Sequence, residues 1–258
     1  MRGSNSLSVL PTDRDLHLFR ELEIAKLVDR EMVQEICGFP SINRANDRLL
    51  QHHRAGFLRR HFVGTEAGGR KALYSLSPKS AAIALPTSHW KLQRPENALL
   101  VGDWFVTHQS AINWIWITAK YRSLPNAQFL RWMTFHKPLS ENVPLIPDGY
   151  FELKTTEGIQ SIFLEADLGT ETSKIWERKT ALYLKLATSG EFSKTFMQPR
   201  FKVAVVATSE LRLRNLRRVV RRHTTRIFFF NTLDTIKSDG LLASSWLRPE
   251  GDARQSLA

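Results

Sequence analysis

The sequence has a single cysteine, Cys37, which excludes an internal disulfide and any cysteine-rich zinc site. It also has no apolar run of the roughly 18–20 residues that a membrane-spanning helix needs. The nearest stretch, 111–119, is short and is interrupted by Asn113. Met1 to Pro11 lack the apolar core and the cleavage site of a signal peptide. We therefore expect a cytoplasmic protein that does not bind a membrane.

Acidic residues are scarce relative to basic ones. The 258 residues include 37 Lys and Arg against 25 Asp and Glu, which gives a net charge of +12. Such an excess favours a polyanionic partner, because each phosphate that Lys or Arg neutralises releases condensed counterions. An ordinary basic surface is the alternative interpretation. A hydrophobic content of 42% excludes global disorder and predicts a packed core.

Residues 1–85 read as three helices followed by a β-hairpin, the order that is typical of a winged-helix domain. The expected helices each begin after a residue suited to cap a helix N-terminus, namely Thr12, Asp29 and Ser41. The expected strands flank a glycine-containing turn and cover residues 57–63 and 72–76. A short helix follows from Ser77-Pro78.

The third helix has a polar face suited to the major groove of DNA. Arg44, Arg48 and Gln51 lie opposite its apolar residues, and Arg and Gln are the side chains that read guanine and adenine. The basic residues of the hairpin are expected to hold phosphates, and they are Arg59, Arg60, Arg70 and Lys71. The alternative is a winged helix that binds protein. We expect His52 and His53 to face solvent, because adjacent helical side chains point about 100° apart.

A second domain is predicted over residues 96–250, after a linker at 86–95 that contains two prolines. A long helix is expected from residue 96 to about 121. The pattern then predicts strands, helices and buried strands in the order α-β-β-β-α-β-α-β, an α+β or α/β architecture. Residues 251–258 are expected to form a disordered tail.

Three carboxylates fall at strand ends of this second domain. Asp148 opens one expected strand, while Glu165 and Asp167 end the next, so that the hairpin they form would bring them together. Carboxylate oxygens suit Mg²⁺ or Mn²⁺, which would polarise a phosphodiester and activate water. The alternative is that these are ordinary polar residues at strand ends.

This arrangement resembles the restriction-endonuclease-like superfamily, whose signature is PD, a spacer and then (D/E)xK. Asp167 stands where that signature has lysine, which departs from the pattern. In some relatives the lysine lies on the following helix, and Lys179 is the candidate here because it shares a helical face with Trp176 and Tyr183.

The chain as a whole resembles the replication-relaxation family of plasmids and other mobile elements. The matching stretches are DRDL at 13–16, RL at 48–49, AGFL at 55–58, YSLSP at 74–78, His108, PD at 147–148 and FLEADLGTE at 163–171, with Lys179 and Tyr183. The family usually has Arg where Leu168 stands. The resemblance implies a winged helix joined to a nuclease-like domain, with roles in plasmid replication and DNA relaxation.

Two further features concern the second domain. His108 lies on the apolar face of the long helix. One interpretation is a buried, structural histidine. The family resemblance implies the other, in which His108 lines the carboxylate site. An arginine-rich helix follows at 210–223, and Glu210 is the only acid near it in the sequence. The arginines expected to follow a nucleic-acid backbone are Arg217, Arg218, Arg221 and Arg222.

Two functions are consistent with these patterns. The first is a protein of a mobile element that selects a site on double-stranded DNA and grips or cleaves it with Asp148, Glu165, Asp167 and Lys179. The second is a non-catalytic regulator of transcription or replication, whose nuclease-like domain forms a homodimer or recruits partner proteins of the same element. The departure from the ExK signature favours the second.

Overall fold

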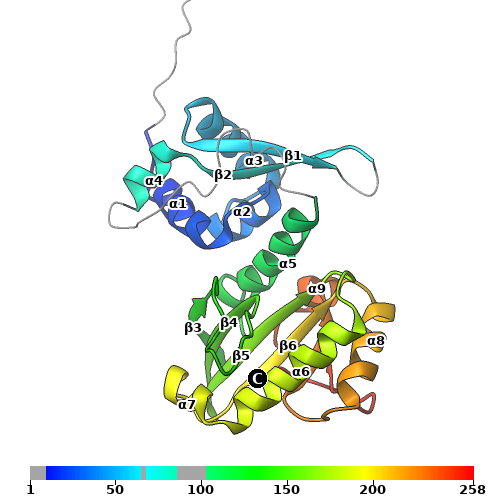
Figure 1. The fold of residues 1–258 in the computed structure, drawn as a ribbon. Helices are drawn as coiled ribbons and strands as arrows, with labels where there is room; N and C mark the ends of the chain where they lie inside the picture. The colour runs from blue at the N-terminus through cyan, green and yellow to red at the C-terminus, as the bar shows by residue number, and fades with distance from the viewer. Residues whose placement is uncertain (1–9, 65–67, 86–102) are drawn as a thin grey trace, which may run out of the picture. The chain divides into compact units, whose positions relative to one another are not determined.

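The computed structural model describes residues 10–64, 68–85 and 103–258 (Figure 1). The chain forms two compact units, Met1–Asn113 and Trp114–Ala258. The boundary falls inside helix α5 (Asp103–Lys120). The expected linker at 86–95 lies outside the described residues.

The first unit has the predicted order of three helices and an antiparallel hairpin. Its elements are α1 (Asp13–Ala25), α2 (Arg30–Cys37), α3 (Ile42–Arg54), β1 (Leu58–Gly64), β2 (Arg70–Leu76) and α4 (Pro78–Ala84). The caps act as the sequence predicts, since Asp29 accepts a hydrogen bond from Met32 N and Ser41 accepts one from Arg44 N. Gly38 ends α2 in the left-handed conformation, at φ 62°.

The N-terminal half of α5 packs with this first unit. Asn113 Nδ2 donates hydrogen bonds to the carbonyls of Ala25 and Leu27, at 2.9 and 2.7 Å. Ala25 is the last residue of α1 and Leu27 follows it, so that both carbonyls lie where the helix ends and no longer pairs them within its own turns. The side chain that interrupts the apolar run of α5 therefore satisfies the end of another helix.

The second unit is built on a mixed seven-stranded sheet in the order β3-β4-β5-β6-β7-β8-β9. Its elements are β3 (Ala127–Met133), β4 (Gly149–Thr155), β5 (Gly158–Asp167), α6 (Ser173–Thr188), α7 (Glu191–Phe196), β6 (Lys202–Ala207), α8 (Glu210–Arg221), β7 (Phe228–Thr232), α9 (Leu233–Asp239), β8 (Trp246–Leu247) and β9 (Arg254–Gln255). The predicted order α-β-β-β-α-β-α-β is confirmed through β7 except for the short helix α7, which was not predicted.

The sheet changes direction at β5. Strands β3, β4 and β5 are antiparallel neighbours, whereas β5, β6 and β7 run parallel. Parallel neighbours need helical crossovers, which α6 and α8 provide, and the two helices contact each other over one face of the sheet (Figure 1). Phe163 of β5 lies at the centre of the aromatic core on that face, against Tyr183 and Phe201. This crossover places the C-terminal end of β5 beneath the first turns of α6.

The expected disordered tail is wrong for residues 254–257. Arg254 and Gln255 form β9, which pairs with β8. Leu257 is fully buried, and its carbonyl accepts a hydrogen bond of 2.6 Å from Lys202 Nζ. A two-residue strand shows no alternation in sequence, so that only its tertiary contacts reveal it.

Candidate functional site

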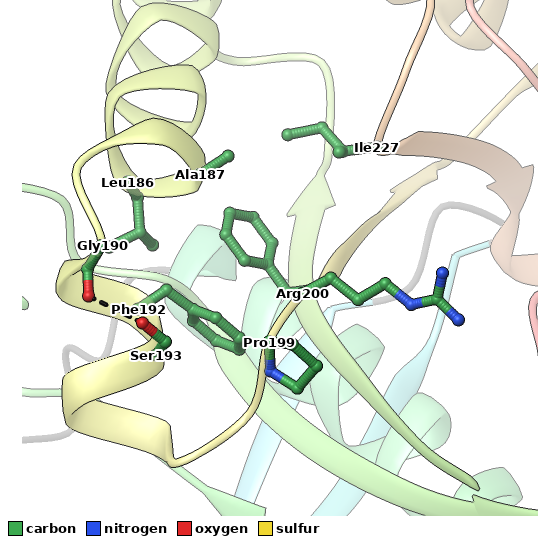
Figure 2. Close-up of a pocket in the computed structure, with 9 residues that line it drawn as sticks. Leu186, Ala187, Gly190, Phe192, Ser193, Pro199, Arg200 and Ile227 are labelled. Atoms are coloured by element: carbon green, nitrogen blue, oxygen red, sulfur yellow. Dashed lines mark hydrogen bonds between the residues drawn. The ribbon is translucent and has the colours of Figure 1, made fainter.

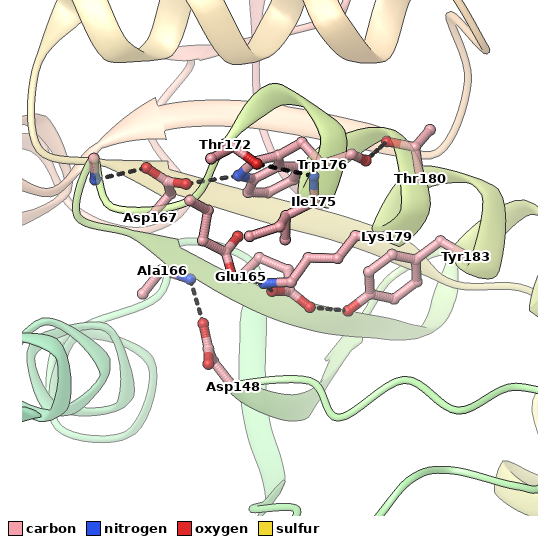
Figure 3. A network of polar contacts seen from close by, with 12 residues as sticks. Asp148, Glu165, Ala166, Asp167, Thr172, Ile175, Trp176, Lys179, Thr180 and Tyr183 are labelled. Atoms are coloured by element: carbon pink, nitrogen blue, oxygen red, sulfur yellow. Dashed lines mark hydrogen bonds and ion pairs between the residues drawn. The ribbon is translucent and has the colours of Figure 1, made fainter.

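The carboxylate cluster lies where β5 ends and α6 begins (Figure 3). Glu165 and Asp167 are two positions apart on β5, so that both side chains point to the same face of the sheet. Residues of α6 at spacings of three and four cover them, namely Trp176, Lys179 and Tyr183.

Glu165 is fully buried and has a partner for each oxygen. Lys179 Nζ lies 2.8 Å from Oε2, and the Tyr183 hydroxyl donates to Oε1 at 2.6 Å. The lysine expected on the following helix therefore does reach this carboxylate. Lys179 also lies 2.6 Å from Glu171 Oε1, so that it joins two acids.

Burial dominates the electrostatics of this pair. It raises the pKa of Glu165 to about 7 against the opposing effect of Lys179, and the charge of Asp148 adds to the rise. Burial alone would lower the pKa of Lys179, but the charges of Glu165, Asp148 and Glu171 hold it above its usual value. Glu165 therefore takes up a proton more readily than an exposed carboxyl does, while Lys179 remains a cation beside it.

Asp167 belongs to a separate set of contacts. Arg212 of α8 binds it through two hydrogen bonds, Nε to Oδ1 at 2.6 Å and Nη2 to Oδ2 at 2.8 Å. Trp176 Nε1 donates to Oδ2 at 2.6 Å. Burial would raise the pKa of Asp167, but these donors hold it below its usual value. Its charge is neutralised by an arginine that lies 45 residues away in the sequence.

Asp148 lies beside this cluster and is half-buried. Its Oδ2 accepts a hydrogen bond of 2.8 Å from Ala166 N, which fixes the carboxylate against the end of β5 (Figure 3). Its negative charge raises the pKa of both Glu165 and Lys179. The structure thus brings Asp148, Glu165 and Lys179 together.

The expected three-carboxylate site for Mg²⁺ or Mn²⁺ is not assembled. In residues 10–64, 68–85 and 103–258, no group of three or more His, Cys, Asp or Glu side chains is placed to hold a metal ion. The physical reason is that Arg212 and Trp176 occupy the oxygens of Asp167, while Lys179 and Tyr183 occupy those of Glu165. The side chains as arranged do not fit a divalent cation.

His108 is half-buried on α5 and belongs to the unit that ends at Asn113. The carboxylates belong to the other unit. A role for His108 beside them stays a prediction.

The polar face of α3 is only partly free. Arg44 and Gln51 are exposed, as predicted, and Asp47 is exposed beside them. Arg48 is instead held by Asp15 of α1, with Nε 2.9 Å from Oδ1 and Nη2 bound to Oδ2. Its Nη1 donates to Gln51 Oε1 at 3.0 Å. The expectation that Arg48 reads bases is therefore wrong, because a buried carboxylate on a neighbouring helix occupies it.

Asp15 also explains a second correction. His52, expected in solvent, is fully buried between the rings of Phe19 and Phe57, and its Nε2 lies 2.7 Å from Asp15 Oδ1. His53 is half-buried against the Leu58 carbonyl. Burial alone would raise the pKa of Asp15, but hydrogen bonds led by Arg48 hold it far below its usual value. The sequence carries one signal for Asp15, a capping box with Thr12 that marks it as a structural residue.

The basic residues of the hairpin differ in their partners. Lys71 Nζ lies 2.5 Å from Asp29 Oδ2, so that it pairs within the unit and is not free for phosphate. Arg59 and Arg60 are half-buried, and Arg70 is exposed.

The arginines of α8 also differ in whether they have partners within the protein. Arg217 donates from Nε to the Arg248 carbonyl at 2.7 Å and binds the Gly251 carbonyl, so that it anchors the C-terminal segment. Arg218, Arg221 and Arg222 are exposed. Glu250 pairs with Arg221 at 2.7 Å and Glu177 with Arg222 at 3.6 Å. Glu210 is therefore not the only acid near these arginines, because the fold brings acids from distant positions.

A separate cavity of about 210 Å³ lies between the end of α6, α7 and the start of β6 (Figure 2). Leu186, Phe192, Phe201 and Ile227 give it an apolar lining, and Arg200 lies beside it. No residue of the carboxylate cluster lines it.

The fold and the cluster define a mixed α+β protein with a helical N-terminal region and a core built on a mixed sheet. In that core an antiparallel β3-β4-β5 meander continues through α6 into parallel β6. The family model described as replication-relaxation matches residues 20–198, more than two thirds of the chain. The protein belongs to the replication-relaxation family.

Comparison with solved structures finds the restriction endonuclease FokI, at 13% identity and a TM-score of 0.28. The match covers 88% of this chain and 45% of that one. A likeness this distant gives no information on activity. No curated protein matches the chain. In the described part of the chain, no helix has the length and apolar character that a membrane span requires.

Proposed function

We propose that this protein binds double-stranded DNA through its N-terminal unit, as a winged-helix protein of a plasmid or another mobile element. The exposed face of α3 carries the proposal. Arg44 and Gln51 are exposed there, on the helix that precedes the β1-β2 hairpin, and they can donate to guanine and adenine edges in the major groove. The net charge of +12 supplies the sequence-independent attraction to phosphate.

The nuclease-like unit contributes contacts to this function rather than cleavage. The buried acids of β5 are neutralised by Lys179 and Arg212, as in a structural ion-pair network. The exposed arginines of α8 offer sequence-independent contacts to a phosphate backbone, Arg218 directly and Arg221 and Arg222 in exchange for their surface partners Glu250 and Glu177.

Arg44→Ala tests the binding proposal. We expect a loss of about 1–3 kcal/mol in binding to a duplex selected from a randomised library, together with a flatter sequence preference. Fluorescence anisotropy measures the affinity. The control is Arg20→Ala, which removes an exposed arginine from α1. Wild-type affinity and preference in Arg44→Ala would exclude base reading by α3.

A metal-dependent DNA endonuclease is the second candidate, because Asp148, Glu165 and Lys179 lie together where the superfamily signature predicts. For a cation to bind there, the Glu165 oxygens would first have to lose the hydrogen bonds from Lys179 and Tyr183.

Incubation of supercoiled plasmid with the protein and Mg²⁺ or Mn²⁺ separates the two candidates. We expect no cleavage, and an unchanged affinity for DNA in Asp148→Asn. Cleavage by the wild type that Asp148→Asn abolishes would establish the nuclease instead. Cleavage that persists in Asp148→Asn would indicate a contaminating enzyme.

A further inference from the structure

The hairpin of the N-terminal unit carries an exposed aromatic side chain between two arginines. Phe62 of β1 is 49% exposed. The guanidinium carbon of Arg60 lies 4.6 Å from the centroid of its ring, and that of Arg70 lies 5.8 Å from it. In the described part of the chain, neither arginine forms an ion pair with an acid, in contrast to Lys71 on the same hairpin.

Packing covers only part of the phenylalanine ring, which is 49% exposed. Its cross-strand partner is Ala72, which offers little surface to cover a ring. Tyr74 is fully buried on the same face of the hairpin, where the Arg60 guanidinium carbon also lies 5.9 Å from its ring centroid, yet Phe62 itself stays half-exposed. A large aromatic side chain left half-exposed is more typical of a binding surface than of a core.

We propose that Phe62 is a minor-groove wedge: the hairpin enters the minor groove of duplex DNA, where Phe62 inserts its ring edge against a base step. This inference rests on the proposed DNA binding of the N-terminal unit. Proteins that bind the minor groove combine apolar wedges with arginines in this way, because the wedge unstacks a step while the cations meet the negative potential of a narrow groove. Arg60 and Arg70 supply these positive charges, and their guanidinium groups also contact the Phe62 ring.

The proposal assigns the two arginines a role beside the base step, on either side of the ring. It also predicts a preference for AT-rich DNA, whose minor groove is narrow and free of the guanine amino group. Base reading by α3 and shape reading by the hairpin would then act at adjacent grooves.

Phe62→Ala tests the wedge on a fluorescein-labelled AT-rich duplex and on a GC-rich duplex of equal length. We expect about a tenfold loss of affinity for the AT-rich duplex, the scale of one lost aromatic-base contact. The salt dependence should not change, because no phosphate contact is lost. Arg70→Ala should instead reduce the salt slope by up to about 0.9. Replacing an adenine in the duplex with 2-aminopurine reports unstacking, which wild type should produce and Phe62→Ala should not.

The control is Ile83→Ala, which removes an apolar side chain of similar exposure, 47%, from α4 of the same unit. Thermal unfolding of Phe62→Ala at the wild-type temperature would show that the fold is intact. Wild-type affinity in Phe62→Ala, with loss in Arg44→Ala, would overturn the wedge and leave the proposed function standing. A loss confined to single-stranded DNA would overturn it in favour of stacking on unpaired bases. Failure of the wild type to bind any duplex would contradict the proposed function itself.

Discussion

Lys179→Met is expected to lower the free energy of unfolding of the C-terminal unit by about 3–5 kcal/mol near neutral pH, the scale for one partner removed from a buried ion pair. Glu165 would keep its hydrogen bond from Tyr183 but would lose its counter-cation in a fully buried position. Urea unfolding followed by circular dichroism and tryptophan fluorescence measures the loss.

The loss should depend on pH in a defined direction. The pKa of Glu165 is raised to about 7 from an ordinary value of 4.5, so that the folded state holds a proton that the unfolded state releases between those values. The contribution of this group to stability is therefore fully present below about pH 4.5 and falls as the pH rises through about 7. Without Lys179 the folded-state pKa rises further. The variant should thus be closest to wild type in mild acid and weakest in mild alkali.

Two further variants isolate the ion pair. Arg178→Met removes an exposed cation from the adjacent position of α6 and should change stability by less than about 0.5 kcal/mol. Adding Glu165→Gln to Lys179→Met removes the stranded charge and should restore part of the loss. A destabilisation that is equal in Lys179→Met and Arg178→Met, or constant from pH 5 to 8, would contradict the buried pair.

Arg48→Met should destabilise the N-terminal unit by about 3 kcal/mol, whereas Arg44→Met on the same helix should leave its stability unchanged. The difference arises because Arg48 neutralises Asp15, which is 2% exposed, while Arg44 faces solvent. Hydrogen exchange of α1 and α3, followed by mass spectrometry, reports on this unit alone.

The stability difference between Arg48→Met and wild type should depend on pH, because Asp15 titrates. Its folded-state pKa is lowered, so that its contribution is present above the unfolded value of 3.8 and is lost as the pH falls below it. The difference between Arg48→Met and wild type should therefore shrink in acid. Equal protection in Arg44→Met and Arg48→Met at neutral pH would show that the Arg48–Asp15 pair contributes no stability.

The two units illustrate what local sequence determines. The helices begin where Asp29 and Ser41 cap them, and the β4-β5 turn forms at Gly158, where φ is 110°. These signals act over three or four residues, and they predicted most of the elements up to β7 and their order, but not α7, α9, β8 or β9. The positions of the carboxylates on β5 followed from the same patterns.

The charge partners did not follow from local sequence. Arg48 meets an acid 33 residues earlier, and Asp167 meets an arginine 45 residues later. A helical wheel shows which face of α3 is polar, but not that part of this face lies against α1. One of these pairs, Asp167 with Arg212, could have been predicted, because Arg212 lies in the first turn of α8. In parallel strands joined by helices, the start of one crossover helix lies beside the end of the neighbouring strand.

The Asp167–Arg212 pair also constrains how this sequence can evolve. Asp167→Lys alone would restore the ExK signature, but it would place a buried ammonium against the Arg212 guanidinium. Losing Arg212 first would leave Asp167 buried without its cation. Either single substitution would leave a buried charge without its partner, so that the residues at positions 167 and 212 constrain each other.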